Sequence, residues 1–520
     1  MPDSIYKVKA AQAHKEIKGI KKQIRQKHKD YRSKQMPPDP ILSIIMRPLL
    51  ALKSAGIEYR ETQGTTVAGF LPTTNLLGNS LPLSAPGYDF SFGMQPGDVL
   101  FKKNSPAQAD RWLDRAAQRG WMSSDTFLNQ QFTQTKLTRL DLKAGFELFP
   151  DFKVDLNAFR EYSDNYSEYF KVVTQGGGWE HLTPMEMGSY TVSYVGLSTF
   201  FKKIDNQGYS QVYDKFLENR TIISQRLGDA NPNSTPYWVN PADSTGQRNY
   251  NYRGGYGPKQ QDVLIASFLA AYSNKDAHHV NVNPFSTIPL PNWRLSYNGL
   301  TKIKWMKKIF TNFNLTHGYS STMTVNSFAT NLDAAKDNHG NLNGKDSLSN
   351  NFFASYNMPS IVINEQFSPL IGIDMTFVNK LSLRFDYKMS KTVTMSFADF
   401  QLIENKSTTI TVGAGYTIKG LKLPIKVNGK KVRLDNDLKF KCDVSYRNGI
   451  TVNHLIDQSI PQITAGSSTL TISPAVDYMI SKGINLRIFV DYSHTNPYVL
   501  SSFPTTNIKG GLQLKMSLVQ

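Results

Sequence analysis

The chain of 520 residues is 40% hydrophobic, 19% charged and 12% aromatic, with 25 Tyr and 29 Phe. The charge content is low for a soluble protein, and the aromatic content suits strands with amphipathic ends. The single cysteine, Cys442, excludes an internal disulfide and a zinc site built from several cysteines.

The N-terminal segment, residues 1–36, is strongly basic. It holds eleven Lys and Arg against three acidic residues, in a chain whose formal net charge is +18. We expect a solvated helical linker with a thin apolar stripe, which consists of Ala10, Ala13, Ile17, Ile20 and Ile24. The alternative is a soluble basic β-protein that binds nucleic acid through this segment. We expect no nucleic-acid partner.

Two apolar runs are candidates for a helical membrane span. Ile41–Leu52 is interrupted by Arg47 and Pro48, and Val263–Tyr272 is shorter still. A spanning helix needs about 18 or more apolar residues, so neither run can cross a bilayer as a helix. The only other structure that spans a membrane is a closed β-barrel, in which every backbone polar group finds a partner.

The first two thirds of the sequence predict strands separated by long polar insertions. Ser80–Gln130 contains a helix that Ser105 caps, Pro106 opens and Gly120 ends, with Trp112, Leu113 and Ala116 on one face. Leu227–Pro258 and Thr330–Asn350 are expected to be polar loops. The expected strands are Gly56–Thr62, Thr138–Phe149, Lys153–Phe159, Ser189–Val195, Trp293–Tyr297, Asn312–Val325 and Asn351–Asn364.

Strict alternation of apolar and polar residues appears from Leu381 onward and continues to the end of the chain. Lys391 and Phe489 are exceptions to it. We predict that one face meets lipid and the other lines a lumen. The predicted lipid-facing residues are Leu383, Phe385, Phe440, Val444, Leu486, Ile488, Leu512 and Leu514. The predicted lumen-facing residues are Arg384, Asp386, Lys388, Lys439, Lys441, Asp443 and Arg487.

The length of these runs favours a membrane barrel over a soluble β-sandwich. Several reach ten residues or more, as a membrane-crossing strand requires, whereas soluble strands cluster near five or six residues. Tyrosines near the run ends suit the aromatic girdles of such barrels, namely Tyr387, Tyr416, Tyr446, Tyr478 and Tyr492. The predicted fold class is all-β: a large transmembrane antiparallel β-barrel, here a partial barrel of about fifteen strands, with helical and irregular loop insertions.

We divide the chain into four parts on this basis. Residues 1–36 are the basic linker, and residues 37–130 are a first strand followed by a cap or loop insertion with helices. Residues 131–290 hold barrel strands with long polar insertions, and residues 291–520 hold the strands of the C-terminal half. No signal-peptide pattern follows Met1, so we expect this chain to be the C-terminal portion of a longer exported protein.

No motif in the sequence indicates catalysis, and we expect no catalytic residue, metal or cofactor. His278 and His279 are adjacent in a polar segment, which suits solvated histidines better than a metal site. Asp337–Gly344 is rich in Asp and Asn but lacks the spacing of a calcium loop, so we expect loop punctuation. An enzyme is therefore not predicted.

Several blocks of sequence resemble the SprA/Sov family, the outer-membrane translocons of the type IX secretion system of Bacteroidetes. The blocks are Gly64–Thr74 with Leu76–Gly78, Gly120–Asp125, Pro291–Thr301, Lys307–Phe310 and Leu315–Thr322. The resemblance implies a very large barrel in the outer membrane of a Gram-negative, Bacteroidetes-like bacterium, which exports folded proteins and supports gliding motility. The chain ends in Gln520 and not in the terminal aromatic residue common in outer-membrane barrels.

The family's partners are expected on the same ground. They are a PorV-like outer-membrane barrel, a periplasmic plug protein and secreted cargo with a C-terminal sorting domain, in addition to the lipid bilayer. A different role is open on the residues alone: a surface barrel or adhesin whose long loops bind glycans or a protein partner.

Overall fold

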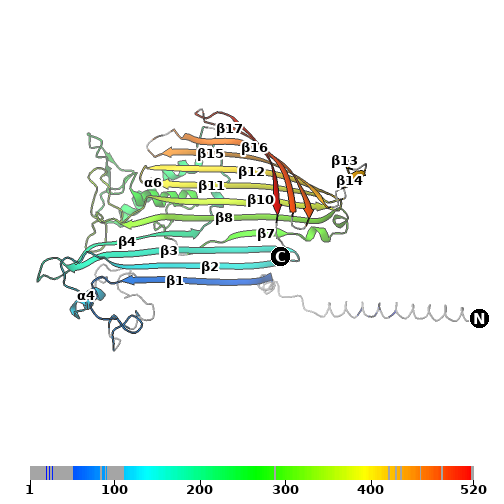
Figure 1. The fold of residues 1–520 in the computed structure, drawn as a ribbon. Coiled ribbons are helices and arrows are strands. Elements are labelled where there is room, and N and C mark those ends of the chain that lie inside the picture. The colour runs from blue at the N-terminus through cyan, green and yellow to red at the C-terminus, as the bar shows by residue number, and fades with distance from the viewer. Residues whose placement is uncertain are drawn as a thin grey trace, which may run out of the picture. The chain divides into compact units, whose positions relative to one another are not determined.

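The computed structural model is an all-β chain built on one antiparallel sheet of fourteen strands (Figure 1). The chain divides into Met1–Lys53 and Ser54–Gln520, and the sheet lies in the second part except for the first residues of β1. The structure describes residues 51–81, 85–87, 111–205, 207–285, 288–419, 422–427, 430–433, 436–456, 458, 460–481, 484–499 and 501–516, with five isolated residues before them or between them. The predicted linker helix, Ser105 and Pro106 lie outside the described residues.

Twelve long strands form the main path of the sheet. In spatial order they are β1 (Leu52–Thr66), β2 (Phe132–Phe149), β3 (Phe152–Val172), β4 (Trp179–Ser193), β8 (Phe310–Thr330), β10 (Ser360–Phe377), β11 (Leu381–Ser396), β12 (Gln401–Ile418), β15 (Leu438–Leu455), β16 (Gln462–Ser481), β17 (Ile484–Pro497) and β18 (Thr505–Met516). Off this path, β7 (Asn292–Tyr297) pairs with β3 and β8, and β9 (Tyr356–Asn357) pairs with β8. Two small pairs are separate, β5 (Trp238–Val239) with β6 (Arg248–Asn249) and β13 (Lys422–Val427) with β14 (Lys430–Arg433).

The two ends of the sheet carry connections of different length. At one end, β2 joins β3 through two residues, and Val378 to Lys380 join β10 to β11. Lys380 adopts a left-handed backbone, with φ of 70°, which closes that turn. At the opposite end, residues 67–131, 194–291 and 331–359 form the longest connections. The short-turn end also carries residues 298–309 and the connection between β12 and β15, which contains β13 and β14. The longest connections thus gather at one end of the sheet, as they do in outer-membrane barrels.

The longest connection folds into a layer of helices on one side of the sheet. It contains α5 (Leu197–Phe200), α6 (Gln211–Ala230) and α7 (Gln261–Tyr272). The Gln260 side chain caps α7 by accepting a hydrogen bond from the backbone N–H of Val263 at 3.0 Å. Every residue from Val263 to Tyr272 is buried, which explains why this helix is apolar all round.

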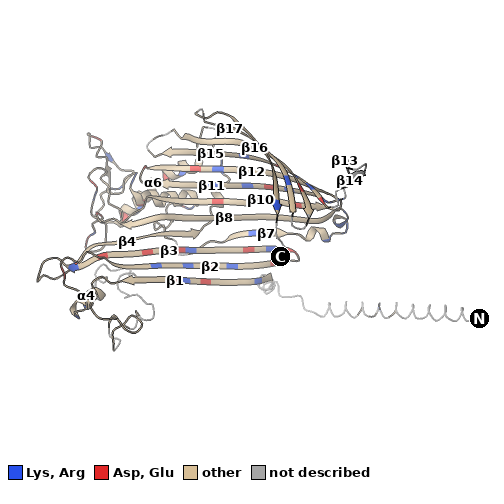
Figure 2. Cartoon of the chain, viewed as in Figure 1, with Lys and Arg blue, Asp and Glu red and all other residues tan. Residues whose placement is uncertain are grey.

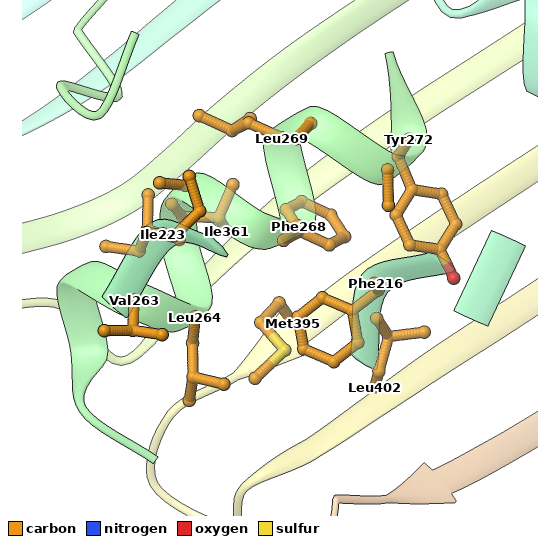
Figure 3. Close-up of a cluster of buried hydrophobic side chains, with 14 of the residues drawn as sticks. Phe216, Ile223, Val263, Leu264, Phe268, Leu269, Tyr272, Ile361, Met395 and Leu402 are labelled. Carbon is orange, nitrogen blue, oxygen red and sulfur yellow. The ribbon is translucent and has the colours of Figure 1, made fainter. Parts of the chain in front are cut away.

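The helix layer shares the main hydrophobic core with the sheet. Figure 3 shows Phe216 of α6 and Phe268 of α7 near Ile361, Met395 and Leu402, which come from β10, β11 and β12. All five side chains are at least nine-tenths buried. The interior core of this chain therefore lies between helices and one face of the sheet, in the half nearest the long connections.

A second, smaller insertion follows β1. Its helix α4 (Arg111–Gln118) buries Leu113 and Ala116 against Phe132 and Phe170, at the start of β2 and the end of β3. Gly120 follows with φ of +68°, a conformation that glycine adopts without strain. The helix predicted from Trp112, Leu113, Ala116 and Gly120 is thus present.

The sheet confirms the predicted fold class, with fourteen strands against about fifteen expected. The strand predicted at Asn351–Asn364 was wrong in its first half: strand pairing begins only with β9 and β10, and Asn351 instead accepts a hydrogen bond from the N–H of Gly257. No sequence pattern indicated α6, whose last residues begin the segment expected to be a polar loop. None of the described helices is both long and apolar enough for a membrane span.

The sheet is open at β1 and β18. These strands stand at the two ends of its path, and no pairing joins them in the described part of the chain. In Figure 1, α6 lies behind β10–β12, whereas the β16–β18 end curls toward the viewer. The sheet therefore bends away from the side that the helices cover.

Gly188 of β4 should not tolerate a side chain. A Cβ there would lie 1.9 Å from the carbonyl oxygen of Ser163 in the neighbouring strand, so Gly188→Ala should cost about 3 kcal/mol or more. Gly413→Ala is the matched control, because its nearest atom, 2.4 Å away, is the mobile carboxylate oxygen of Asp443. That change should stay within about 1 kcal/mol. Urea unfolding in detergent measures both, and equal midpoints would contradict the expectation.

Candidate pore-lining face

Strand pairing assigns each side chain to one of two faces of the sheet, because directly paired residues point to the same side and consecutive residues to opposite sides. Arg384 pairs with Gly413, and Gly413 pairs with Asp443. We call the face that carries these residues the polar face. The seven predicted lumen-facing residues all lie on it, namely Arg384, Asp386, Lys388, Lys439, Lys441, Asp443 and Arg487.

The opposite face, the apolar face, carries all eight predicted lipid-facing residues. Phe385 pairs with Val412, and Val412 pairs with Val444. At the far end of the sheet, Leu486 pairs with Leu514 and Ile488 with Leu512. The same register places Leu383 and Phe440 on this face. The pairing thus fixes which residues share a face, whatever medium each face meets.

Acidic and basic residues are mixed along the strands (Figure 2), and several of those on the polar face form ion pairs. Asp477 of β16 forms ion pairs with Lys441 at 2.8 Å and with Arg487 at 3.8 Å. Arg384 contacts Asp386 at 2.6 Å along β11, which buries the Asp386 carboxylate. On β2 and β3, Arg139 contacts both Asp141 and Glu161 at 2.7 Å.

Neutral side chains on this face pair with one another across strands. Thr411 lies 3.2 Å from Ser445, Thr469 lies 3.1 Å from Thr495, and Asn405 donates to Thr451 at 3.0 Å. Glycines deepen the surface: Gly413 and Gly415 form the floor of a hollow of about 460 Å³ between β8 and β15. The face thus combines paired polar side chains with charged residues of both signs.

Phe489, an exception to the alternation, lies on the polar face. It pairs with Gly511, and its ring covers that glycine so closely that a Cβ there would lie 2.9 Å from Phe489 Cζ. The guanidinium of Arg487 lies 5.9 Å from the same ring. The aromatic residue therefore fills the space that glycine leaves on the neighbouring strand.

The apolar face has a band of uniform composition next to the short-turn end. In each of six successive strands, a run of nine residues has only apolar or tyrosine side chains on this face. A tilted strand of about nine residues suffices to cross a membrane. The runs are Leu381–Met389, Ile410–Ile418, Leu438–Tyr446, Leu470–Tyr478, Ile484–Tyr492 and Ile508–Met516. We call these runs together the apolar band.

Tyrosines mark the two margins of the apolar band. Tyr387, Tyr446 and Tyr492 lie toward the margin near the long connections. Tyr416 and Tyr478 lie at the margin near the short turns. Beyond the first margin the next residue on this face is polar in every one of the six strands. These residues, the boundary row, are Lys391, Thr408, Asn448, Ser468, His494 and Thr506.

Past the boundary row, the helix layer covers the apolar face of the central strands and encloses charged groups. Lys391 is 2% exposed, and its Nζ donates to the carbonyl oxygen of Thr199 at 3.3 Å and lies 5.1 Å from the ring of Tyr272. The Tyr272 hydroxyl donates to Glu404, which is 1% exposed. Burial, and then the negative charge of Glu404, raise the pKa of Tyr272 well above its usual range.

Sequence reasoning missed this buried polar cluster. Lys391 breaks the apolar alternation because it meets a helix, and Val263–Tyr272 is apolar because it packs on the same face. Together, the charged residue in an apolar run and the fully apolar helix indicate that a layer of helices covers this face. The same layer shields Glu365, which accepts a hydrogen bond from Tyr319 at 2.7 Å.

The two segments weighed as weak ion sites have structural roles instead. The Asp337 carboxylate accepts hydrogen bonds from the backbone N–H groups of His339 and Asn341 and from the Asn233 side chain, at 2.8 to 2.9 Å. These donors hold the pKa of Asp337 well below its usual range and make it a loop anchor. His279 is exposed and contacts Asp276. Among the described residues, no group of three potential ligands could hold a metal ion.

Comparisons with known proteins give only weak structural likenesses. No protein-family model matches the chain, and no curated protein matches it either. OmpT, an outer membrane protein of Vibrio cholerae, matches at 9% identity over 74% of this chain and 92% of its own length, with a TM-score of 0.18. An anion-selective porin from Comamonas acidovorans matches at 8% identity over 72% and 84%, with a TM-score of 0.10. Likenesses this weak identify no family for the chain.

Ion pairs on the polar face should matter much less for stability than the cluster beneath the helices. Asp477→Asn removes a pair whose Lys441 side chain is half exposed, so it should cost less than about 1 kcal/mol. Tyr272→Phe leaves the buried Glu404 carboxylate without its hydroxyl donor and should cost about 1–3 kcal/mol or more. The two unfolding midpoints in detergent measure the difference, and the reverse order would contradict this assignment.

Proposed function

We propose that this chain forms part of the wall of a protein-conducting outer-membrane pore that exports folded proteins. In this proposal the apolar band meets hydrocarbon, the polar face lines a hydrated lumen, and the helix layer stands outside the bilayer on the extracellular side. The chain acts as a structural wall and carries no catalytic group.

A single observation carries the proposal: the apolar band has a sharp limit, while the polar face is hydrophilic along whole strands. A soluble β-sandwich needs a second layer over its entire apolar face. Here the helices cover only the part beyond the boundary row, and the apolar band stays bare. Leu512 and Leu514, for example, are 67% and 49% exposed. Bare apolar surface of this extent is explained by lipid.

The curvature and the open edges favour a wide barrel. The sheet bends away from the helix-covered face, so the polar face is the concave one. In the described part of the chain, β1 and β18 each have one edge without a partner strand, and such an edge is not stable in hydrocarbon. Further strands between these edges would make a barrel larger than the twelve strands of this path, and large barrels enclose water-filled lumens.

The resemblance to the SprA/Sov family supplies the specific form of this proposal. On that ground the pore belongs to type IX secretion and gliding motility in a Bacteroidetes-like outer membrane. The same ground supplies a PorV-like barrel, a periplasmic plug protein and cargo with a C-terminal sorting domain as partners. The polar face and the open sheet support this assignment because folded cargo requires a wide polar passage.

Cysteine labelling along one strand tests which medium each face meets. In a Cys442→Ala background, single cysteines replace Phe440, Lys441, Asp443 or Val444 of β15. In membranes, a water-soluble maleimide should label positions 441 and 443 at least tenfold faster than 440 and 444, because only the polar face is wet. A polymer-bound maleimide as bulky as a small folded protein should still reach position 443 if the lumen is wide.

Unfolding in detergent provides the control, since all four cysteines should then react alike. Equal labelling of the four positions in membranes, or a chain that stays monodisperse without detergent, would contradict a lipid-facing band. Rapid labelling of position 443 by the small reagent alone would favour a narrow barrel that binds partners through its loops.

A charge in the apolar band should destabilise the chain in a lipid-dependent way. Leu514→Arg should cost about 2–4 kcal/mol in a bilayer, because it buries a cation in hydrocarbon. Gln513→Arg is the matched control, because Gln513 is the next residue along the strand and lies on the polar face. This change should leave the stability nearly unchanged. Unfolding in lipid vesicles compares the two. If both variants are equally stable there, Leu514 does not meet hydrocarbon.

A further inference from the structure

One short segment of the helix layer lies directly at the margin of the apolar band. Phe201–Tyr209 connects α5 to α6, and we call it the margin loop. The ring of Phe201 lies 5.5 Å from that of Phe367, whose partner Met389 is the last residue of the apolar band in β11. Any role of this loop at the bilayer rests on the proposed function, because that function sets the position of the membrane.

The margin loop crosses several strands close to the boundary row. Lys406, one position beyond Thr408 on the same face of β12, donates through Nζ to the carbonyl oxygen of Lys202 at 3.1 Å. Gly208, with φ of +94°, lies so close to Val452 of β15 that a Cβ would be 3.1 Å from its Cγ1. The loop is therefore held against β10, β12 and β15, with Phe201 at the margin of the apolar band and Gly208 two same-face positions beyond the boundary row.

Its exposed side chains combine aromatic and cationic character. Phe201 is 52% exposed and Tyr209 is 43% exposed, and Lys202 and Lys203 are exposed between them. Asp205 is the acidic residue of the loop. Its carboxylate accepts hydrogen bonds from the N–H groups of Gln207 and Tyr209 at 2.9 and 2.8 Å, so it serves the turn.

Membrane lipids offer both an apolar and an anionic surface at the margin of the apolar band. Aromatic rings at a bilayer margin sit at the headgroup level, and lysines near a membrane surface attract anionic headgroups. We infer that the margin loop binds the phosphorylated headgroups of outer-leaflet lipids, with Lys202 and Lys203 on phosphate oxygens and Phe201 and Tyr209 against the upper acyl region. This contact would hold the helix layer, and through it the sheet, at a fixed depth.

Quenching by brominated lipids tests the inference on the full chain in vesicles. A bimane label on Tyr209→Cys, in a Cys442→Ala background, reports the lipids beside the loop. Brominated phosphatidic acid should quench it at least about fivefold more effectively than brominated phosphatidylcholine, because even one lysine near the surface enriches anionic headgroups roughly fivefold. Lys202→Gln with Lys203→Gln should abolish the preference. Lys215→Gln is the control, since Lys215 of the same layer donates to Asn274 at 2.9 Å and should leave the preference intact.

The native Cys442 separates the two possible failures, because it lies within the apolar band. If a bimane label there escapes both brominated lipids, the proposed membrane face is wrong and the inference falls with it. If Cys442 is quenched but the Tyr209 site shows no preference for phosphatidic acid, the inference alone is overturned. Inorganic phosphate at matched ionic strength should not remove the preference, and its removal would show a site for free phosphate instead of lipid.

Discussion

The constraint on which this structure depends is that backbone polar groups must pair within the sheet wherever water is absent. β11 pairs with β12, and β12 with β15, over sixteen and eighteen consecutive residues without an offset. Because no register shift intervenes, one odd-even alternation passes unchanged from strand to strand. The apolar band and the polar face are therefore both set by the same strand register. A slip of one residue in any strand would move its apolar side chains to the polar face.

The helix layer follows from the same alternation. The strands run on past the boundary row, and their side chains continue to alternate, so the apolar face of the central strands needs a protein cover there. α6 and α7 provide that cover with Phe216 and Phe268. This protein layer supplies hydrogen-bond partners to buried polar groups. Lys391 donates to a backbone carbonyl, and Glu404 accepts from a tyrosine hydroxyl. On the apolar face, the buried charged residues Lys391 and Glu404 thus lie beyond the apolar band.

Most of the sheet was predictable because alternation with period two is a local property of sequence. In the runs that begin at Leu381, Leu438 and Ile484, the sequence of each strand alone shows which residues share a face. The helix layer was not predictable in this way, since α7 is apolar all round and carries no periodic stripe. Phe489 shows the other limit: its place opposite Gly511 depends on which strands pair, and only the register reveals it. The assignment of lumen and lipid to the two faces stays a prediction.

The chemistry of the polar face bears on what such a wall can do. A protein that passes along a surface of unpaired charges of one sign would be held by it if its own charge were opposite. Here Asp477 pairs with Lys441 and Arg487, and Asp386 pairs with Arg384, while hydroxyl and amide side chains pair across the strands between them. Because the basic partners Arg384 and Lys441 are about half exposed, each pair should add little to stability. Acidic and basic side chains are therefore mixed on the polar face, and under the proposed function this mixture would limit the binding of a passing chain of either charge.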